Sequence, residues 1–230
     1  MGQLKAVMKR FVIGRPGLVP HAIRRGLLRG LAFHIDAATK SQRVLGLDEA
    51  EITSAIRRLT ADAGSALDIG ANDGWYSLYF ASRPNIERVI AFEPCQALMG
   101  RVQENFALND PTFAEKLSCM NTFVGTTDDE NWCTVDSVVN DLPRPILLKI
   151  DVDGGELDVL RGGRRLLESG QALLVIETHS KDLEDDCFAL LADFGYEVRV
   201  VRNAWYRWLI PEARPLIHNR WLVASPNVRR

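Results

Sequence analysis

The chain has 230 residues, of which 47% are apolar and 25% charged, and its formal net charge is −2. This length and composition suit one large soluble globular domain with an N-terminal extension, which can bury a proper core. The near-neutral net charge argues against general affinity for nucleic acid. The charge is unevenly placed, because residues 1–47 carry nine Lys and Arg against one acid, and the rest carries 19 basic and 29 acidic residues. This basic segment either packs against the acidic remainder of the chain or makes peripheral contact with an anionic membrane.

The sequence shows neither a secretory signal nor a transmembrane helix. The first 14 residues lack a long apolar centre, and the longest apolar runs are only as long as strands. The four cysteines have no C-x-x-C spacing and no nearby histidine, which is typical of reduced thiols rather than of zinc sites or disulfides. We therefore expect a cytoplasmic protein, with no indication of its oligomeric state.

The N-terminal quarter gives weaker structural signals than the rest. Ile23–Ile35 contains Gly26 and Gly30 and is ambiguous between a helix and a small hairpin, whereas Glu49–Leu59 has the pattern of an amphipathic helix. We therefore divide the chain into a basic N-terminal extension, residues 1–62, and a cofactor-binding domain, residues 63–230.

From Ser65 onward, strand and helix patterns alternate, which predicts an α/β fold with a mostly parallel sheet. The predicted strands are Ala66–Ile69, Arg88–Phe92, Leu117–Val124, Ile146–Val152, Ala172–Thr178, Glu197–Val201 and Arg220–Ser225. The predicted helices are Trp75–Ala81, Gln96–Leu108, Glu156–Glu168 and Leu183–Phe194. We expect the last strand to pair antiparallel with the one before it.

The first predicted strand ends in a glycine-punctuated turn that carries acids, Leu67–Gly74. Gly70 and Gly74 would permit the turn, while Ala71 and Asn72 would present backbone amides to a ligand. The alternative is a turn whose Asn and Asp side chains only cap the following helix. The phosphate-binding pattern G-x-G-x-x-G is absent, and an acid in the loop would repel a pyrophosphate. A cofactor with a positive amine or sulfonium and a ribose fits better, and S-adenosylmethionine is the candidate.

Two acids would hold this cofactor across the carboxyl ends of neighbouring strands. Asp68 would position its amino acid end, directly or through water, and Glu93, 25 positions later, would accept hydrogen bonds from both ribose hydroxyls. The alternative for Glu93 is a surface acid that happens to precede Pro94.

Charged residues also occur at the ends of two later strands. Period-two alternation places Lys149, Asp151 and Asp153 on one face if the strand continues that far. A buried strand seldom carries unpaired charges, so Lys149 and Asp151 are either mutual partners or site residues. Asp151 counts both as a cofactor-binding and as a catalytic candidate, Lys149 as catalytic, and Asp153 as a substrate contact. Glu156 is either a substrate contact or a charge at a helix N-terminus.

The next strand ends in Ile176–His179, which contains one acid and one histidine. His179 could take a proton from a hydroxyl acceptor, although a hydrogen-bonded rim histidine is the alternative. Glu177 is a candidate substrate contact. Asp151 and Glu156 could instead bind a metal, but no histidine accompanies them in the sequence, so we predict no metal. Trp205, Tyr206 and Trp208 could line an acceptor pocket or belong to the core.

These blocks, in this order, resemble the FkbM family of S-adenosylmethionine-dependent methyltransferases. The matching blocks are Leu67–Gly74, Val89–Pro94, Asn105–Asn109, Thr134–Asp136, Leu148–Glu156, Leu160–Gly162 and Val175–His179. The sequence departs from the family where Asp153 and Gly155 replace the usual Glu and Ala. The resemblance implies a class I methyltransferase fold, Rossmann-like, with a mostly parallel seven-stranded sheet, helices on both faces and an antiparallel last strand.

The resemblance also implies an enzyme that methylates oxygen on sugars or small natural products. We therefore predict an S-adenosylmethionine-dependent methyltransferase, and more narrowly an O-methyltransferase, with a small-molecule or glycan acceptor. The alternative is a non-catalytic cofactor-binding or assembly module that retains the fold. A nicotinamide-dependent oxidoreductase is disfavoured by the missing phosphate-binding pattern.

Overall fold

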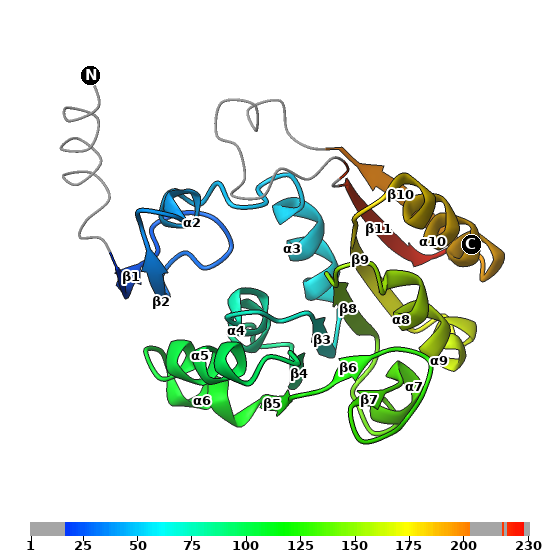
Figure 1. The fold of residues 1–230 in the computed structure, drawn as a ribbon, viewed down its shortest axis with the longest axis horizontal. Helices are drawn as coiled ribbons and strands as arrows, with labels where there is room; N and C mark the ends of the chain where they lie inside the picture. The colour runs from blue at the N-terminus through cyan, green and yellow to red at the C-terminus, as the bar shows by residue number, and fades with distance from the viewer. Residues whose placement is uncertain (1–16, 203–217, 219, 228–230) are drawn as a thin grey trace.

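The computed structural model describes residues 17–202, 218 and 220–227, and its centre is a seven-stranded sheet (Figure 1). The strand order is β10-β11-β9-β8-β3-β4-β5. The bounds are β3 Ser65–Ile69, β4 Arg88–Phe92, β5 Leu117–Met120, β8 Ile146–Ile150, β9 Ala172–Thr178, β10 Tyr196–Val201 and β11 Arg220–Pro226. Strands β5, β4, β3, β8 and β9 run parallel, whereas β11 is antiparallel to both β9 and β10. The predicted fold class is confirmed.

Helices cover both faces of this sheet (Figure 1). One face carries α3 Thr53–Asp62, α4 Trp75–Ala81 and α5 Gln96–Phe106, and the short α6 Pro111–Glu115 lies beside α5. The other face carries α7 Val135–Val138, α8 Glu156–Gly162, α9 Arg164–Glu168 and α10 Lys181–Asp193. Alternate residues of the strands, such as Ala66 and Leu67, belong to the two separate cores, as the period-two geometry of a strand requires.

The sequence left Ile23–Ile35 open between a helix and a small hairpin, and the structure shows that this segment belongs to a hairpin. Strands β1 Leu18–Ala22 and β2 Ala32–Asp36 pair antiparallel, and the short helix α2 Ser41–Leu45 follows. Ile23, Phe33 and Ile35 are buried in the same core as α3 and α4. The helix predicted at Glu49–Leu59 begins later, at Thr53, and ends at Asp62.

Several predicted elements have different bounds in the structure. The strand expected at Leu117–Val124 ends at Met120, and β6 Phe123–Val124 pairs instead with β7 Trp132–Cys133 in a separate small sheet. The helix expected at Glu156–Glu168 is two helices that meet at Gly163, where the carboxylate of Asp136 accepts hydrogen bonds from the first turn of α9. The strand expected at Ile146–Val152 ends at Ile150.

Within the described ranges, no helix has both the length and the apolar character needed to cross a membrane. Residues 1–16 of the basic segment 1–47, to which the membrane contact was assigned, and the aromatic residues 205, 206 and 208 lie outside the described part of the chain.

Candidate active site

A cavity of about 630 Å³ opens at the carboxyl ends of the parallel strands. The chain runs from β3 to β4 and β5 on one side of β3 and returns to β8 and β9 on its other side. Such a reversal of strand order leaves a crevice at the carboxyl ends, where doubly wound sheets bind their ligands. The cavity is lined by residues at the ends of β3, β4, β8 and β9. Several residues between Lys40 and Glu49, and the pair Phe123 and Trp132, complete its wall.

Gly70 lets the ends of β3 and β8 approach each other. Its φ is +79°, and a Cβ there would lie 1.9 Å from the carbonyl oxygen of Asp151. The backbone N–H of Asp151 donates to the carbonyl oxygen of Ile69 at 3.0 Å. The backbone N–H of Gly70 donates to the carbonyl oxygen of Phe92, also at 3.0 Å. A glycine is therefore required here both for its conformation and for the space.

The carboxylate of Glu93 is held in place by two backbone amides from different segments. Asn72 N–H donates to Oε2 at 2.9 Å and Cys95 N–H donates to Oε1 at 3.0 Å. Glu93 is only 8% exposed, yet it lines the cavity together with Pro94 and the turn residues Gly70, Ala71 and Asn72. Because each carboxylate oxygen has further lone pairs, both can still accept hydrogen bonds from a ligand.

Asp68 and Gly74 do not line the cavity, although the sequence placed both among the cofactor-binding candidates. Asp68 is fully buried; its Oδ2 accepts from the hydroxyl of Ser77 at 2.6 Å, and Lys149 Nζ lies 3.7 Å from its Oδ1. Burial raises the pKa of Asp68 in spite of the opposing effects of Lys149 and Ser77. Gly74, with φ +87°, begins α4 and faces Val102. Asp68 therefore contacts a residue of the cavity wall, Lys149, but does not line the cavity itself.

Lys149 is a buried ammonium group that lies between two carboxylates. It is 2% exposed, and its Nζ lies 3.0 Å from Asp151 Oδ2 and 5.0 Å from the centre of the Tyr76 ring. Burial opposes its charge, but Asp151, Asp68 and Glu49 together raise its pKa. Lys149 and Asp151 are thus mutual partners, and both also line the cavity. A lysine with a raised pKa is not a proton acceptor at neutral pH.

His179 is held by Glu156, the first residue of α8. The distance from Nδ1 to Glu156 Oε1 is 2.5 Å, and Nε2 lies 3.8 Å from Asp151 Oδ1 and 3.9 Å from Asp153 Oδ1. The hydrogen bond that the carboxylate of Glu156 accepts from the ring is the main cause of the raised pKa of His179. Glu156 is fully buried and does not line the cavity, whereas His179 and the exposed Asp153 do.

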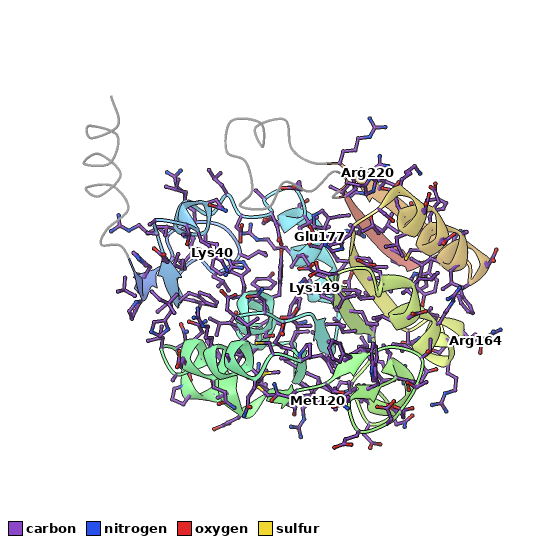
Figure 2. The ribbon with its side chains drawn as sticks, viewed as in Figure 1. Lys40, Met120, Lys149, Arg164, Glu177 and Arg220 are labelled. Atoms are coloured by element: carbon purple, nitrogen blue, oxygen red, sulfur yellow. The ribbon has the colours of Figure 1, made fainter. Side chains whose placement is uncertain are left out.

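Glu177 completes a compact cluster with Asp151 and His179. One ligand atom from each of the three residues lies within 4.8 Å of the other two. Burial, followed by the negative charges of Asp151 and Glu49, raises the pKa of Glu177 to about 10. Lys149 and Glu177, from neighbouring strands, are labelled near the centre of Figure 2. The sequence argument against a metal was that no histidine accompanies Asp151 and Glu156; that argument is wrong, because His179 contacts both in space.

Sequence reasoning missed one wall of the cavity, which the segment after the hairpin forms. The hydroxyl of Tyr76 donates to Glu49, a residue with φ +45° whose burial, with the charge of Asp48, raises its pKa to about 8. Arg43 binds Asp73 at 2.6 Å and Asp48 at 2.8 Å. No local pattern marks Glu49 or Arg43, because Tyr76 and Asp73 lie 27 and 30 positions away from them in the sequence.

Exposed aromatic rings form the opposite rim. Phe123 and Trp132 stack with their ring centres 4.8 Å apart, and they are 47% and 40% exposed. Two exposed, stacked rings at the rim of a cavity offer an apolar surface to a ligand. The signal was present in the sequence only as two isolated aromatic residues, because β6 and β7 pair across a nine-residue separation.

Comparison with known proteins agrees with this architecture. Residues 122–198 match the family model described as the Methyltransferase FkbM domain. The structure of methyltransferase FkbM from Methylobacillus flagellatus KT superposes with a TM-score of 0.56 at 19% identity, over 70% of this chain and 44% of that one. An rRNA methylase from Streptococcus thermophilus superposes with a TM-score of 0.50 at 13% identity, over 76% of this chain and 96% of that one.

No curated protein matches the sequence. The chain spans less than half the length of the Methylobacillus protein. The part matched by the family model contains Asp151, Glu156, Glu177 and His179 but not the glycine turn. The chain therefore has the class I methyltransferase fold, and its resemblance to the FkbM methyltransferases is confirmed by the domain match at residues 122–198.

Proposed function

We propose that the chain is an S-adenosylmethionine-dependent O-methyltransferase that acts on a hydroxyl of a sugar or small natural product. The observation that carries this proposal is the arrangement of the cavity. The amide-bound carboxylate of Glu93 lies at one side, and the cluster of Asp151, Glu177 and His179 lies at the other. One side suits a ribose, and the other suits a reacting hydroxyl.

The residues present fit the cofactor. Glu93 would accept the ribose hydroxyls, and the backbone of Gly70, Ala71 and Asn72 would approach the ligand closely, as no larger residue could at Gly70. Carboxylates outnumber cations among the lining residues, and Arg43 is already neutralised by Asp73 and Asp48. The remaining negative charge favours the amine and sulfonium of the cofactor. Asp151 would take the amino acid end, with Asp68 acting only through Lys149.

When bound, the cofactor supplies a methyl group on a sulfonium sulfur; the acceptor oxygen forms the new C–O bond as the C–S bond breaks and S-adenosylhomocysteine leaves. Alignment of the acceptor with the methyl group contributes much of the rate in such a displacement. The chain must also receive the hydroxyl proton. His179 and Asp151 are the proposed groups, with Glu177 and Asp153 as contacts to the acceptor and Glu156 orienting His179.

A non-catalytic binding module explains the cavity less well. Such a module has no need of the buried Lys149, Glu156 and Glu177, and burying ionisable groups costs free energy unless they are carefully paired. The acceptor that we propose is a small molecule or glycan. A cytoplasmic location is part of the same proposal and rests on the four cysteines, all of which are free thiols.

Calorimetric binding of S-adenosylmethionine and S-adenosylhomocysteine tests the cofactor. We expect Glu93→Ala to weaken both about ten- to a hundredfold, because hydrogen bonds to a charged group contribute roughly 1.5–3 kcal/mol. The matched control is Glu104→Ala, which removes an exposed carboxylate from α5 and should leave affinity unchanged. Absence of binding to the folded wild-type chain would reject the proposed function.

A further inference from the structure

We propose that Asp151, Glu177 and His179 form a binding site for a divalent cation of the Mg²⁺ or Mn²⁺ class, which holds the acceptor hydroxyl. The role of the cation rests on the proposed methyl transfer, whereas the site itself rests only on these side chains. It replaces the sequence-based expectation of no metal.

The three side chains are already arranged around a common point. Their ligand atoms lie within 4.8 Å of one another. Two ligands about 2.1–2.2 Å from the same ion are at most about 4.4 Å apart, so small side-chain rotations would complete the coordination. Asp151 follows β8 and Glu177 lies near the end of the adjacent β9, so the sheet itself sets the spacing of the two carboxylates.

His179 forms its hydrogen bond to Glu156 through Nδ1, which leaves Nε2 able to bind a metal ion. Metal-binding histidines usually donate their other ring N–H to a carboxylate, which fixes the orientation of the ring. Here the fully buried Glu156 binds Nδ1 at 2.5 Å, so Nε2 is the nitrogen that faces Asp151 and Asp153. Glu156 is therefore a positioning residue, and its second oxygen, Oε2, has no hydrogen-bond partner among the described residues.

Two carboxylates, those of Asp151 and Asp153, lie near Nε2 of His179, and a positive charge between them would be stabilised. The distances of 3.8 and 3.9 Å to the carboxylates of Asp151 and Asp153 are too long for hydrogen bonds. Lys149, the neighbouring ammonium, is bound to Asp151 Oδ2 and also lies near Asp68, whereas Asp151 Oδ1 faces His179. When neutral His179 donates its Nδ1–H to Glu156, its Nε2 is an acceptor, and a cation could bind Nε2 together with these carboxylate oxygens.

Carboxylates suit Mn²⁺ and Mg²⁺, which favour octahedral geometry, and two of the three ligands here are carboxylates. Three protein ligands leave positions open for oxygen atoms of the acceptor, and adjacent hydroxyls on a sugar could occupy two of them. A bound cation would lower the pKa of a coordinated hydroxyl, so the acceptor could pass its proton to solvent water without a histidine base. His179 would then serve as a ligand.

Titration of the EDTA-treated full chain with Mn²⁺, followed by electron paramagnetic resonance of the free ion, tests the site without acceptor or cofactor. We expect one bound Mn²⁺ per chain in the wild type and at least tenfold weaker binding in His179→Ala and the isosteric Glu177→Gln. Glu156→Gln should weaken binding about ten- to a hundredfold, as expected for a partner of a ligating histidine. Asp158→Asn, which removes an exposed acid from the same helix, is the control and should bind normally.

Circular dichroism and binding of S-adenosylhomocysteine establish that each variant is folded. A folded wild type that binds S-adenosylhomocysteine but no Mn²⁺ at millimolar concentration would overturn the metal proposal and leave the proposed function standing, with His179 as the base. Equal Mn²⁺ binding by wild type, His179→Ala and Glu177→Gln would also overturn it, since the ion would then lie elsewhere. Mn²⁺ binding without any cofactor binding would support the site and reject the proposed function.

Discussion

Gly70 shows how a single residue links the fold to the site. Its positive φ and the 1.9 Å that would separate a Cβ from the carbonyl oxygen of Asp151 leave no room for a side chain. The same close approach places Asp151 beside the glycine turn and within reach of Lys149. One glycine therefore positions residues on two strands that are about 80 positions apart in the sequence.

Replacing Gly70 tests this role. We expect Gly70→Ala to lower the free energy of unfolding by roughly 2–4 kcal/mol, because the left-handed conformation and the clash with Asp151 are both unfavourable. Urea unfolding followed by circular dichroism measures the change. Gly100→Ala is the control: Gly100 lies inside α5 with nothing within 4 Å of its Cβ position, so alanine should stabilise the protein by about 0.5–1 kcal/mol. An equal effect in both variants would show that the site tolerates a side chain.

At the scale of elements, ion pairs to the carboxylate of Asp73 connect α2 and the residue before it to the glycine turn. Arg43 lies 2.6 Å from Asp73, and Lys40 lies 3.3 Å from the same carboxylate (Lys40 is labelled in Figure 2). Burial opposes the charge of Asp73, but Arg43 and Lys40 outweigh it and lower the pKa of the carboxyl group. For these two residues of the basic segment, packing against the chain's own acids is the observed arrangement.

We expect Asp73→Asn to destabilise the protein by about 1.5–3 kcal/mol at pH 7, since a charge-assisted hydrogen bond to a largely buried arginine is lost. Because the folded pKa of Asp73 lies below its unfolded value, this contribution is present above about pH 4 and is lost as the pH falls through the folded pKa. The difference between wild type and variant in urea unfolding should therefore shrink below pH 4. A difference that stays constant down to pH 2 would contradict the assignment; Asp158→Asn should change stability little at either pH.

At the scale of the whole molecule, the N-terminal hairpin packs into one of the two hydrophobic cores of the central sheet. Phe33 is completely buried, its ring centre lies 5.0 Å from that of Trp75 in an edge-to-face arrangement, and both belong to the core on the α3 and α4 face. The division at residue 62 remains a prediction, and these contacts favour joint folding of the two parts.

We expect Phe33→Ala to lower the stability of the entire chain by about 3–5 kcal/mol, the usual effect of removing a buried aromatic side chain. Tryptophan fluorescence and circular dichroism should report the same unfolding midpoint, as in a two-state transition. Phe188→Ala, which removes a ring that is 40% exposed, is the control and should have a small effect. If Phe33→Ala instead produced an early separate transition, the hairpin would be an independent unit.

From Ser65 onward, the sequence alone predicted the seven strands of the central sheet and the main helices between them, because periodicity and glycine turns act over a few residues. The bounds of β4, α4 and β9 agree with prediction, and Glu93 was identified because an acid directly after a buried strand is a local signal. The break in the helix at Gly163 and the end of β5 at Met120 were missed, since Asp136 and the β6–β7 pairing that cause them are distant in sequence.

Only the tertiary structure decided which charges meet. It buried Asp68 behind Lys149, removed Gly74 from the cavity wall, and brought Arg43 to Asp73 and Glu49 to Tyr76. It also placed His179 between Glu156 and Asp151, the contact on which the metal site depends. Electrostatic interactions act through space over several ångströms, so the partners of a charge are set by the packing of strands and helices and not by the residues next to it in the chain.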